Sequence, residues 1–207
     1  MTITIRKALD TDAPTLSRIC LLTADAGSTA EALHDFGELP GLVYAVPYVK
    51  VPTTWGFVMV DDLRDNEVVG YIVGSTDTRA FESYTAEHWW PQLAEKYPPS
   101  MAEKEADARY MNLFRNMFKA SDACVAFSPA HMHINILPEY HQQGWGRKLL
   151  SSAVKFLKGE GLSGVWLGLD PRNSGARAFY ERVGFRHVDG FPDNYMGLRF
   201  GEDVEVS

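Results

Sequence analysis

One stretch of the sequence, residues 131–158, carries three successive patterns that constrain how the chain folds. Apolar and polar residues alternate from His131 to Ile136, which is the period of a β-strand with one buried face, and Pro138 ends that pattern. Gly144 and Gly146 follow a short polar turn. Apolar residues then recur at helical spacing, at Leu149, Leu150, Ala153, Val154 and Leu157. The stretch therefore predicts a strand, a glycine turn and a helix in immediate succession.

The start of this helix is suited to an anion. The first N–H groups of a helix have no intrahelical partner and carry partial positive charge, so two glycines there let a phosphate or diphosphate approach without a Cβ in the way. A tight turn also requires small residues, and that alternative stays open. Two familiar phosphate motifs do not fit, because no Gly-Lys-Ser/Thr follows and no third glycine comes three residues later.

The same stretch resembles the GNAT superfamily of acetyl-CoA-dependent N-acetyltransferases. That family has a strand ending in Pro and then Gln/Arg-x-x-Gly-x-Gly/Ala, and here Pro138 precedes residues 141–146, which read HQQGWG. His141 departs from the pattern, at a position where the family contact is largely main-chain. A second family signature, Asn-x-x-Ala-x-x-x-Tyr-x-x-x-Gly-Phe, is matched at every fixed position by residues 173–185.

Size and composition bound the architecture. The 207 residues, of which 45% are hydrophobic, suffice for one sizeable core, and we expect a single domain over residues 1–207. The sequence shows no apolar run long enough for a membrane span and no signal-peptide core, so we expect a cytoplasmic location, with a nuclear one open. Cys20 and Cys124 are expected to be buried thiols. The net charge of -7 disfavours nucleic acid and mildly favours an amine substrate.

The resemblance implies an α/β fold, with a mixed, mostly antiparallel sheet flanked by helices and splayed where acetyl-CoA inserts. Residue patterns place further strands at residues 2–7, 54–60, 68–75 and 165–169, and a last hairpin from residues 187–188 and 195–200. A first helix, capped by Thr11 or Asp12, is expected to end near Gly27, and others are expected at about 29–36, before Gly159, and before Gly184. A polar tail is expected from residue 201 on.

Residues 78–121 are longer than the connection usual in the superfamily between the third and fourth strands, and they predict an insertion of two helical pieces around Pro98 and Pro99. The insertion is rich in aromatic residues, among them Trp89 and Trp90. They either stack on a sugar or an aliphatic amine, or pack the insertion onto the domain, which is the favoured interpretation. Residues 70–97 also resemble the acetyltransferase-like C-terminal domain of eukaryotic O-GlcNAc hydrolase and its free-standing microbial relatives.

The superfamily resemblance implies which residues bind acetyl-CoA, the expected co-substrate. Main-chain N–H groups of the glycine turn would hold the diphosphate, with added charge from Arg147 and Lys148. The pantetheine arm would lie along the strand near Ile134 and Ile136, and the acetyl carbonyl would meet the Ile136 N–H. The implied cofactor-binding residues are Ile134, Ile136, Gln142, Gln143, Gly144, Trp145, Gly146, Arg147, Lys148, Asn173, Ala176 and Tyr180.

Tyr180 matches the tyrosine that the family uses as general acid toward the departing thiolate, although it would also complete an apolar helix stripe with Phe179. For the general base, His133 is the first choice, because it lies on the polar face of the strand nearest the thioester and titrates in range. His131 follows, and so does Asp170, which ends the neighbouring strand. A water chain stays open as an alternative, and no metal is expected.

These features predict an N-acetyltransferase that works by direct attack in a ternary complex on a primary amine. The acceptor classes, in order of preference, are an amino sugar, another small amine and a protein lysine. No cysteine is placed for a covalent route. The alternatives are a non-catalytic acetyl-CoA-binding or protein-interaction module of the same fold, and a nucleotide-binding protein that uses the same glycine turn. A homodimer is left open.

Overall fold

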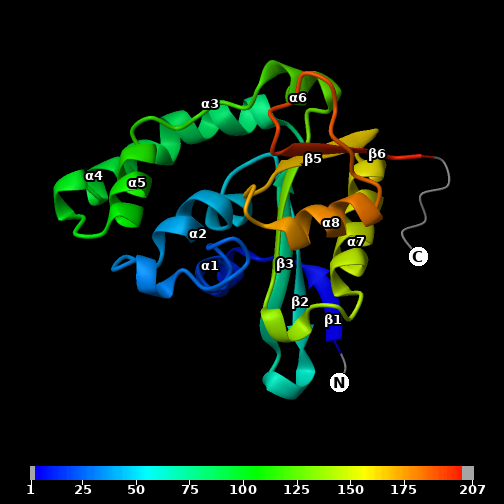
Figure 1. Ribbon diagram of the computed structural model, residues 1–207, viewed down its shortest axis with the longest axis horizontal. Helices are drawn as coiled ribbons and strands as arrows, with labels where there is room; N and C mark the ends of the chain where they lie inside the picture. The colour runs from blue at the N-terminus through cyan, green and yellow to red at the C-terminus, as the bar shows by residue number, and fades with distance from the viewer. Residues whose placement is uncertain (1–2, 202–207) are drawn as a thin grey trace.

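The computed structural model describes residues 3–201 and is built around a six-stranded sheet whose strands follow chain order (Figure 1). The strands are β1 (Ile3–Lys7), β2 (Thr54–Asp61), β3 (Glu67–Ser75), β4 (His131–Ile136), β5 (Gly164–Gly168) and β6 (Tyr195–Arg199). Neighbouring strands run antiparallel except β4 and β5, which are parallel. The predicted mixed, mostly antiparallel sheet is confirmed. Thr2 and most of the predicted polar tail lie outside the described residues.

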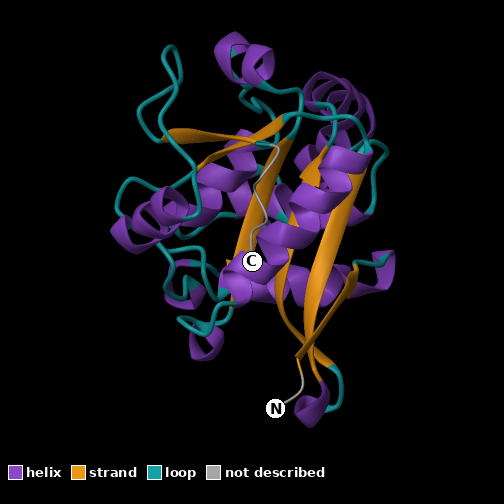
Figure 2. Cartoon of the chain, turned by 90° about the vertical axis from the view of Figure 1, so that its right-hand side faces the viewer, coloured by secondary structure: helices purple, strands orange, loops and turns teal. Residues whose placement is uncertain are grey.

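Helices cover both faces of the sheet. One face carries α7 (Trp145–Gly159) and α8 (Ser174–Arg182), and the other carries α1 (Ala13–Leu21) and α2 (Leu39–Tyr44) (Figure 1). Figure 2, seen from the α7 side, shows helices lying across the strands. The insertion forms α3 (Thr78–His88), α4 (Trp90–Lys96) and α5 (Glu105–Leu113), and α6 (Asp122–Phe127) follows it. The far ends of α4 and α5 project away from the sheet (Figure 1).

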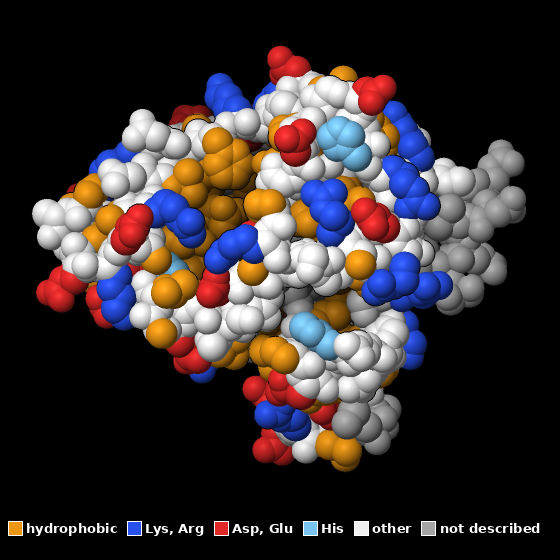
Figure 3. All heavy atoms as spheres, in the orientation of Figure 1, with side chains coloured by type: hydrophobic (Ala, Val, Ile, Leu, Met, Phe, Trp, Pro, Cys, Tyr) orange, Lys and Arg blue, Asp and Glu red, His pale blue; other side chains and the backbone are white. Residues whose placement is uncertain are grey.

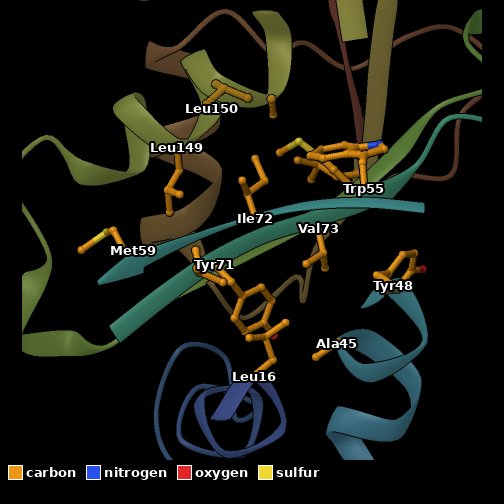
Figure 4. Close-up of a cluster of buried hydrophobic side chains, with 14 of the residues drawn as sticks. Leu16, Ala45, Tyr48, Trp55, Met59, Tyr71, Ile72, Val73, Leu149 and Leu150 are labelled. Carbon is orange, nitrogen blue, oxygen red and sulfur yellow. The ribbon is translucent and has the colours of Figure 1, made fainter. Parts of the chain in front are cut away.

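The main core lies on both faces of β3, because successive strand residues point to opposite sides. Ile72 faces Leu149 and Leu150 of α7, whereas Tyr71 faces Leu16 of α1 (Figure 4). All five side chains are fully or almost fully buried. The helix predicted after the glycine turn is thus confirmed, and its apolar stripe is the one that covers the sheet.

A second cluster of buried residues packs the insertion onto α2, and it contains Leu39, Val43, Trp90, Leu93, Tyr97, Tyr110, Met111 and Phe114. Trp89 Nε1 donates to the Leu42 carbonyl at 3.1 Å. The buried Asp107 carboxylate lies 2.6 Å from His34 Nδ1 and joins α5 to the segment before α2. Trp89 and Trp90 thus pack the insertion onto the domain, as the favoured interpretation predicts, and Trp90 also lines the cleft described below.

Four local predictions need correction. The first helix ends at Leu21 rather than near Gly27. The helix expected at about 29–36 is only a 3-10 turn over Glu31–Leu33. The last hairpin does not form, since β6 pairs with β5 and the segment before it contributes one bridge, from Arg186 to Gly197. The insertion has more helical pieces than expected, although Pro98 does mark the break between α4 and α5.

Two further expectations concern cysteines and membranes. Cys20 and Cys124 are free and buried, as predicted. Burial raises the pKa of the Cys20 thiol to about 12, so this thiol is protonated near neutral pH. None of the helices among residues 3–201 is both long and apolar enough to cross a membrane.

Candidate active site

The parallel strands β4 and β5 meet at a single bridging pair, His131 and Trp166, and then separate. On its other edge β4 stays paired with β3, and Leu137, just beyond it, still donates its N–H to a β3 carbonyl. In such a ladder the N–H groups of alternate residues point to opposite edges of the strand. The N–H groups of Ile136 and Ile134 therefore point away from β3 and into the opening between β4 and β5. These are the main-chain donors predicted to contact the pantetheine arm and the acetyl carbonyl.

The glycine turn leads into the first turn of α7 with a strained backbone. Gln142 and Gly144 have positive φ angles of 59° and 82°. A Cβ on Gly144 would meet no protein atom within 4 Å, so the space before the helix start is open. A Cβ on Gly146 would come within 3.0 Å of the Phe179 ring, so this glycine permits the close contact of α7 with α8. Gly144 thus leaves room for a ligand, and Gly146 serves packing.

Side chains around the turn hold it against the end of β4. His141 Nε2 lies 2.8 Å from the Ile136 carbonyl, so the residue that departs from the family pattern ties the turn to the strand. Gln143 Nε2 donates to a carbonyl of the preceding turn at 2.8 Å. Lys148 Nζ lies 3.9 Å from the centre of the Trp145 ring. The predicted diphosphate-binding residues from Gln142 to Lys148, Arg147 included, therefore lie together at the start of α7.

Helix α8 places a hydroxyl in the site. Asn173 caps the helix, with its Oδ1 accepting the Ala176 N–H at 2.9 Å. Tyr180 is 8% exposed, and its hydroxyl has no hydrogen-bond partner among the described residues. This hydroxyl is not fully enclosed, because within residues 3–201 the one fully enclosed side-chain N or O atom without a partner is Trp55 Nε1. The Tyr180 hydroxyl therefore reaches the cleft that Tyr180 lines. Burial raises its pKa well above the ordinary value, so it is protonated and able to donate.

A cleft of about 1270 Å³ joins these parts. It extends from the opening between β4 and β5 to the insertion, and Figure 3 shows a hollow with hydrophobic side chains at its floor and Lys and Arg side chains at its edge. Aromatic and histidine side chains make up much of its wall, namely His34, Tyr44, Tyr48, Phe81, Trp90, Tyr110, Phe118, His131, His133, Trp166, Tyr180 and Tyr195. A smaller hollow of about 800 Å³ between α3 and residues 119–122 contains none of the predicted site residues.

The two histidines of β4 share one hydroxyl. Tyr48 Oη lies 2.8 Å from His131 Nε2 and 3.0 Å from His133 Nε2. Burial lowers the pKa of His131 to about 3 and that of His133 to about 4, so both rings are neutral near pH 7. The other nitrogen of His131, Nδ1, lies 2.8 Å from Thr78 Oγ1. His131 thus has both ring nitrogens engaged, whereas only Nε2 of His133 is bonded among the described residues.

Asp170, the third candidate base, lies at the cleft edge in an ion pair. Its carboxylate is 2.7 Å from Arg172 Nη2, and the same guanidinium reaches Asp25 at 2.9 Å. The hydrogen bond from Arg172 lowers the pKa of Asp170, which makes it a weaker proton acceptor. Arg172 engages both oxygens of Asp170, whereas His133 keeps one ring nitrogen unbonded within residues 3–201.

Most of the sequence matches a known protein family. The family described as "Acetyltransferase (GNAT) family" matches residues 34–185 of this chain. The chain belongs to this family. A solved structure named SsHAT is 30% identical, spans 98% of this chain and 100% of that one, and superposes with a TM-score of 0.82. The PaiA N-acetyltransferase from Thermoplasma acidophilum, solved with coenzyme A, shares the fold with a TM-score of 0.59 at 15% identity, over 97% of this chain and 100% of that one.

Curated GNAT relatives match shorter parts of the chain. The [ribosomal protein bS18]-alanine N-acetyltransferase of Haemophilus ducreyi is 26% identical over 125 residues, which are 56% of this chain and 81% of that protein. Its counterpart from Haemophilus influenzae is 42% identical over 57 residues, 28% of this chain, and there the match spans only 38% of the relative.

The GNAT site has the donors that acetyl-CoA requires. Main-chain N–H groups face the opening at Ile134 and Ile136, and the start of α7 offers further N–H groups beside the open space at Gly144. Other GNAT structures were solved with coenzyme A or acetyl-CoA. Within residues 3–201, His, Cys, Asp and Glu side chains form no group of three or more that could hold a metal ion.

Sequence reasoning missed the partners of the histidines in this GNAT site. Tyr48 lies in a 3-10 turn, Val46–Val49, in a segment for which the sequence predicted no helix or strand. Thr78 begins α3 and was read as part of the insertion. The one signal was the placement of His131 and His133 on the same polar face of a strand, because ring nitrogens that the fold removes from water require hydrogen-bond partners.

Proposed function

We propose that this chain transfers acetyl from acetyl-CoA to a primary amine by direct attack in a ternary complex. The observation that carries the proposal is the opening between β4 and β5. Its unpaired main-chain donors, the start of α7, the Tyr180 hydroxyl and the His133 ring all border one continuous region. Such a site can hold a thioester, donate a proton and accept one, which are the requirements of acyl transfer to an amine.

Acetyl-CoA, when bound, supplies the thioester carbon at which the amine nitrogen forms its new bond as the C–S bond breaks. The Ile136 N–H stabilises the developing oxyanion. His133 accepts the proton that the amine nitrogen loses, directly or through a water, and Tyr180 donates a proton to the departing sulfur. Asn173 and Ala176, at the start of α8, contact the arm of the co-substrate. Cys20 takes no part as a nucleophile, because its thiol is protonated.

The low pKa of His133 restricts the form in which the acceptor reacts. An alkylammonium has a pKa near about 10.4 and His133 one of about 4, so direct proton transfer between them is strongly unfavourable. The acceptor therefore reacts as the free amine, and His133 takes the proton only as the carbon–nitrogen bond forms and makes that nitrogen acidic.

The acceptor classes are an amino sugar, another small amine or a protein lysine, and the relatives add a fourth. The names of the Haemophilus proteins specify an alanine of a ribosomal protein. The ring-lined cleft supports an acceptor with a face that stacks on aromatic side chains, such as a sugar. The relationship of residues 70–97 to the O-GlcNAc hydrolase domain is part of this proposal, and the cytoplasmic location and the homodimer stay predictions.

The alternative is a module of the same fold that binds acetyl-CoA or a protein without turnover. The open space at Gly144 fits both functions, because each requires the co-substrate to bind. The hydroxyl of Tyr180 and the unbonded nitrogen of His133, both at the cleft, favour the enzyme, because a binding module requires neither.

Release of free CoA separates the two functions. Acetyl-CoA would be incubated with the chain and one amine at a time: glucosamine, spermidine, a lysine peptide and a peptide with N-terminal alanine. We expect CoA release that depends on one of these amines, with a mass increase of one acetyl group in that amine. Saturable binding of acetyl-CoA without release in the presence of every amine class would reject the enzyme in favour of the binding module.

A further inference from the structure

Four side chains form a continuous hydrogen-bonded chain beneath the cleft. Thr78 Oγ1 lies 2.8 Å from His131 Nδ1, and Tyr48 Oη links His131 Nε2, at 2.8 Å, to His133 Nε2, at 3.0 Å. The residues come from α3, from β4 and from the 3-10 turn before β2. Thr78, Tyr48 and His131 are all buried. A chain of this kind has two possible directions of donation, and they leave His133 with different nitrogens protonated.

Thr78 decides the direction. Its hydroxyl also lies 2.7 Å from the Pro129 carbonyl oxygen, which can only accept a hydrogen bond. Two oxygens at that distance repel unless a proton lies between them, so the single hydroxyl proton of Thr78 points at Pro129. His131 Nδ1 must then carry a proton and donate it to Thr78 Oγ1.

The remaining protons follow from that assignment. His131 is neutral, so with Nδ1 protonated its Nε2 is unprotonated and accepts the Tyr48 hydroxyl proton. The Tyr48 oxygen then accepts from His133 Nε2. His133 is also neutral, and its Nδ1 is therefore unprotonated. Within the described part of the chain this Nδ1 has no hydrogen-bond partner and is not fully enclosed, so its lone pair is open to the cleft that His133 lines.

We propose that Thr78, His131 and Tyr48 are positioning residues, which fix the direction of this chain so that His133 presents an unprotonated Nδ1 to the acceptor amine. The inference rests on the proposed acetyl transfer and adds how the base is prepared. Without the Thr78 hydroxyl, the chain is free to reverse. His131 would then donate through Nε2 and Tyr48 would donate to His133 Nε2, which would leave His133 protonated at Nδ1 and unable to accept.

A purely structural network would satisfy the same buried atoms in either direction, so the direction of donation is what must be measured. Long-range ¹H–¹⁵N correlation spectra of the full chain, with ¹⁵N-labelled histidine, report which nitrogen of each ring carries the proton. Near pH 7 we expect His131 to be protonated at Nδ1, the tautomer less common in free imidazole side chains, and His133 at Nε2. Protonation of His131 at Nε2 and of His133 at Nδ1 would overturn the proposal.

A matched pair of variants at Thr78 tests the consequence. Thr78→Val removes the hydroxyl while keeping the shape of the side chain, and we expect it to lower kcat by about tenfold or more without changing acetyl-CoA affinity. Thr78→Ser restores a hydroxyl and should recover both the rate and the tautomers. Equal rates in wild type and in a folded Thr78→Val protein would contradict the proposal.

Tyr48→Phe provides a second test at the middle of the chain. If Tyr48 acts through His133, the double variant with His133→Ala should be no slower than His133→Ala alone, because the two losses are not independent. Independent, multiplying losses would assign Tyr48 a separate role and reject the inference. Tyr97→Phe is the control, since it removes another buried hydroxyl, bonded to Glu38 at 2.8 Å, away from the cleft, and should leave kcat unchanged.

The two proposals fail in different ways. Absence of acetyl transfer with every amine would remove the proposed function, whereas the tautomers of the two histidines are measured without any substrate. Transfer that proceeds with the opposite tautomers would keep the function and overturn only the inference.

Discussion

The two β4 histidines show how burial decides protonation at the scale of single residues. Their folded-state pKa values, about 3 for His131 and about 4 for His133, lie below the ordinary value near about 6.5. At pH values between the folded and unfolded pKa values, the unfolded chain binds more protons than the folded chain. The free energy of unfolding therefore has its full value above about pH 6.5 and falls as the pH drops toward 4. Each ring contributes on the order of 3 kcal/mol to that loss.

The expected result is a lower midpoint of urea unfolding at pH 5 than at pH 7. A His133→Gln variant carries one titrating ring fewer and should lose less stability between the two pH values. A midpoint that does not change between pH 7 and pH 5 would contradict the burial of neutral rings, and so would a variant with the same pH dependence as wild type.

Tyr180 offers a direct test of the proton donor. Tyr180→Phe removes the hydroxyl but keeps the ring that contacts Phe179 and Phe185 at centroid distances of 5.4 and 5.3 Å. We expect kcat to fall by about a hundredfold, with acetyl-CoA affinity nearly unchanged, in steady-state kinetics and calorimetry. Tyr84→Phe, at an exposed tyrosine of α3, is the control. An unaltered kcat in Tyr180→Phe would remove Tyr180 as the acid.

At the scale of elements, the start of α7 carries the cofactor prediction. Gly144→Glu would place bulk and negative charge where no protein atom lies within 4 Å, so the loss should fall on the ligand. We expect acetyl-CoA affinity to drop by at least about a hundredfold in calorimetry, which is about 2.7 kcal/mol. Gly161→Glu is the matched control, because Gly161 has a similar positive φ of 78° and also lies in open space, but beyond the other end of the helix, so this variant should bind normally. Equal affinities in the two variants would place the ligand elsewhere.

Local sequence patterns predicted the helices and strands whose structure follows from residues close together in the chain. Helix α7 and the hairpin of β2 and β3 follow from spacing within a few residues. Helix α2 was not predicted, because Pro40 and Gly41 are residues that disfavour a helix interior. Pro40 lies in the first turn, where a helix tolerates proline, and a Cβ on Gly41 would come within 2.2 Å of Ser17 Oγ. Contact with α1, not local preference, selects that glycine.

At the scale of the whole molecule, the sequence predicted the acetyl-CoA side of the site better than the acceptor side. The former lies on β4, α7 and α8, whose signatures are contiguous. The latter depends on pairs far apart in the chain, such as Tyr48 with His131, separated by 83 residues, and His34 with Asp107, separated by 73. No spacing in the sequence indicates such pairs, because only the folded sheet and insertion bring them together.

A substitution in the insertion should therefore change the binding of the acceptor amine rather than that of acetyl-CoA. Asp107→Ala leaves the buried His34 ring without its hydrogen-bond partner and should cost about 1–3 kcal/mol in urea unfolding. Because α5 lines the cleft, KM for the amine should rise while acetyl-CoA affinity stays constant. Asp35→Ala, which breaks an exposed pair with Lys104, should cost under about 1 kcal/mol. A loss of acetyl-CoA affinity in Asp107→Ala would contradict this division of the cleft.

The most direct measurement is a crystal structure of the chain with coenzyme A bound. The account predicts the diphosphate at the N–H groups of residues 142–148, and the pantetheine arm between β4 and β5 with its sulfur near Tyr180. Coenzyme A bound away from Gly144, with the opening between β4 and β5 empty, would contradict the assignment of the site and the acetyl transfer proposed for it.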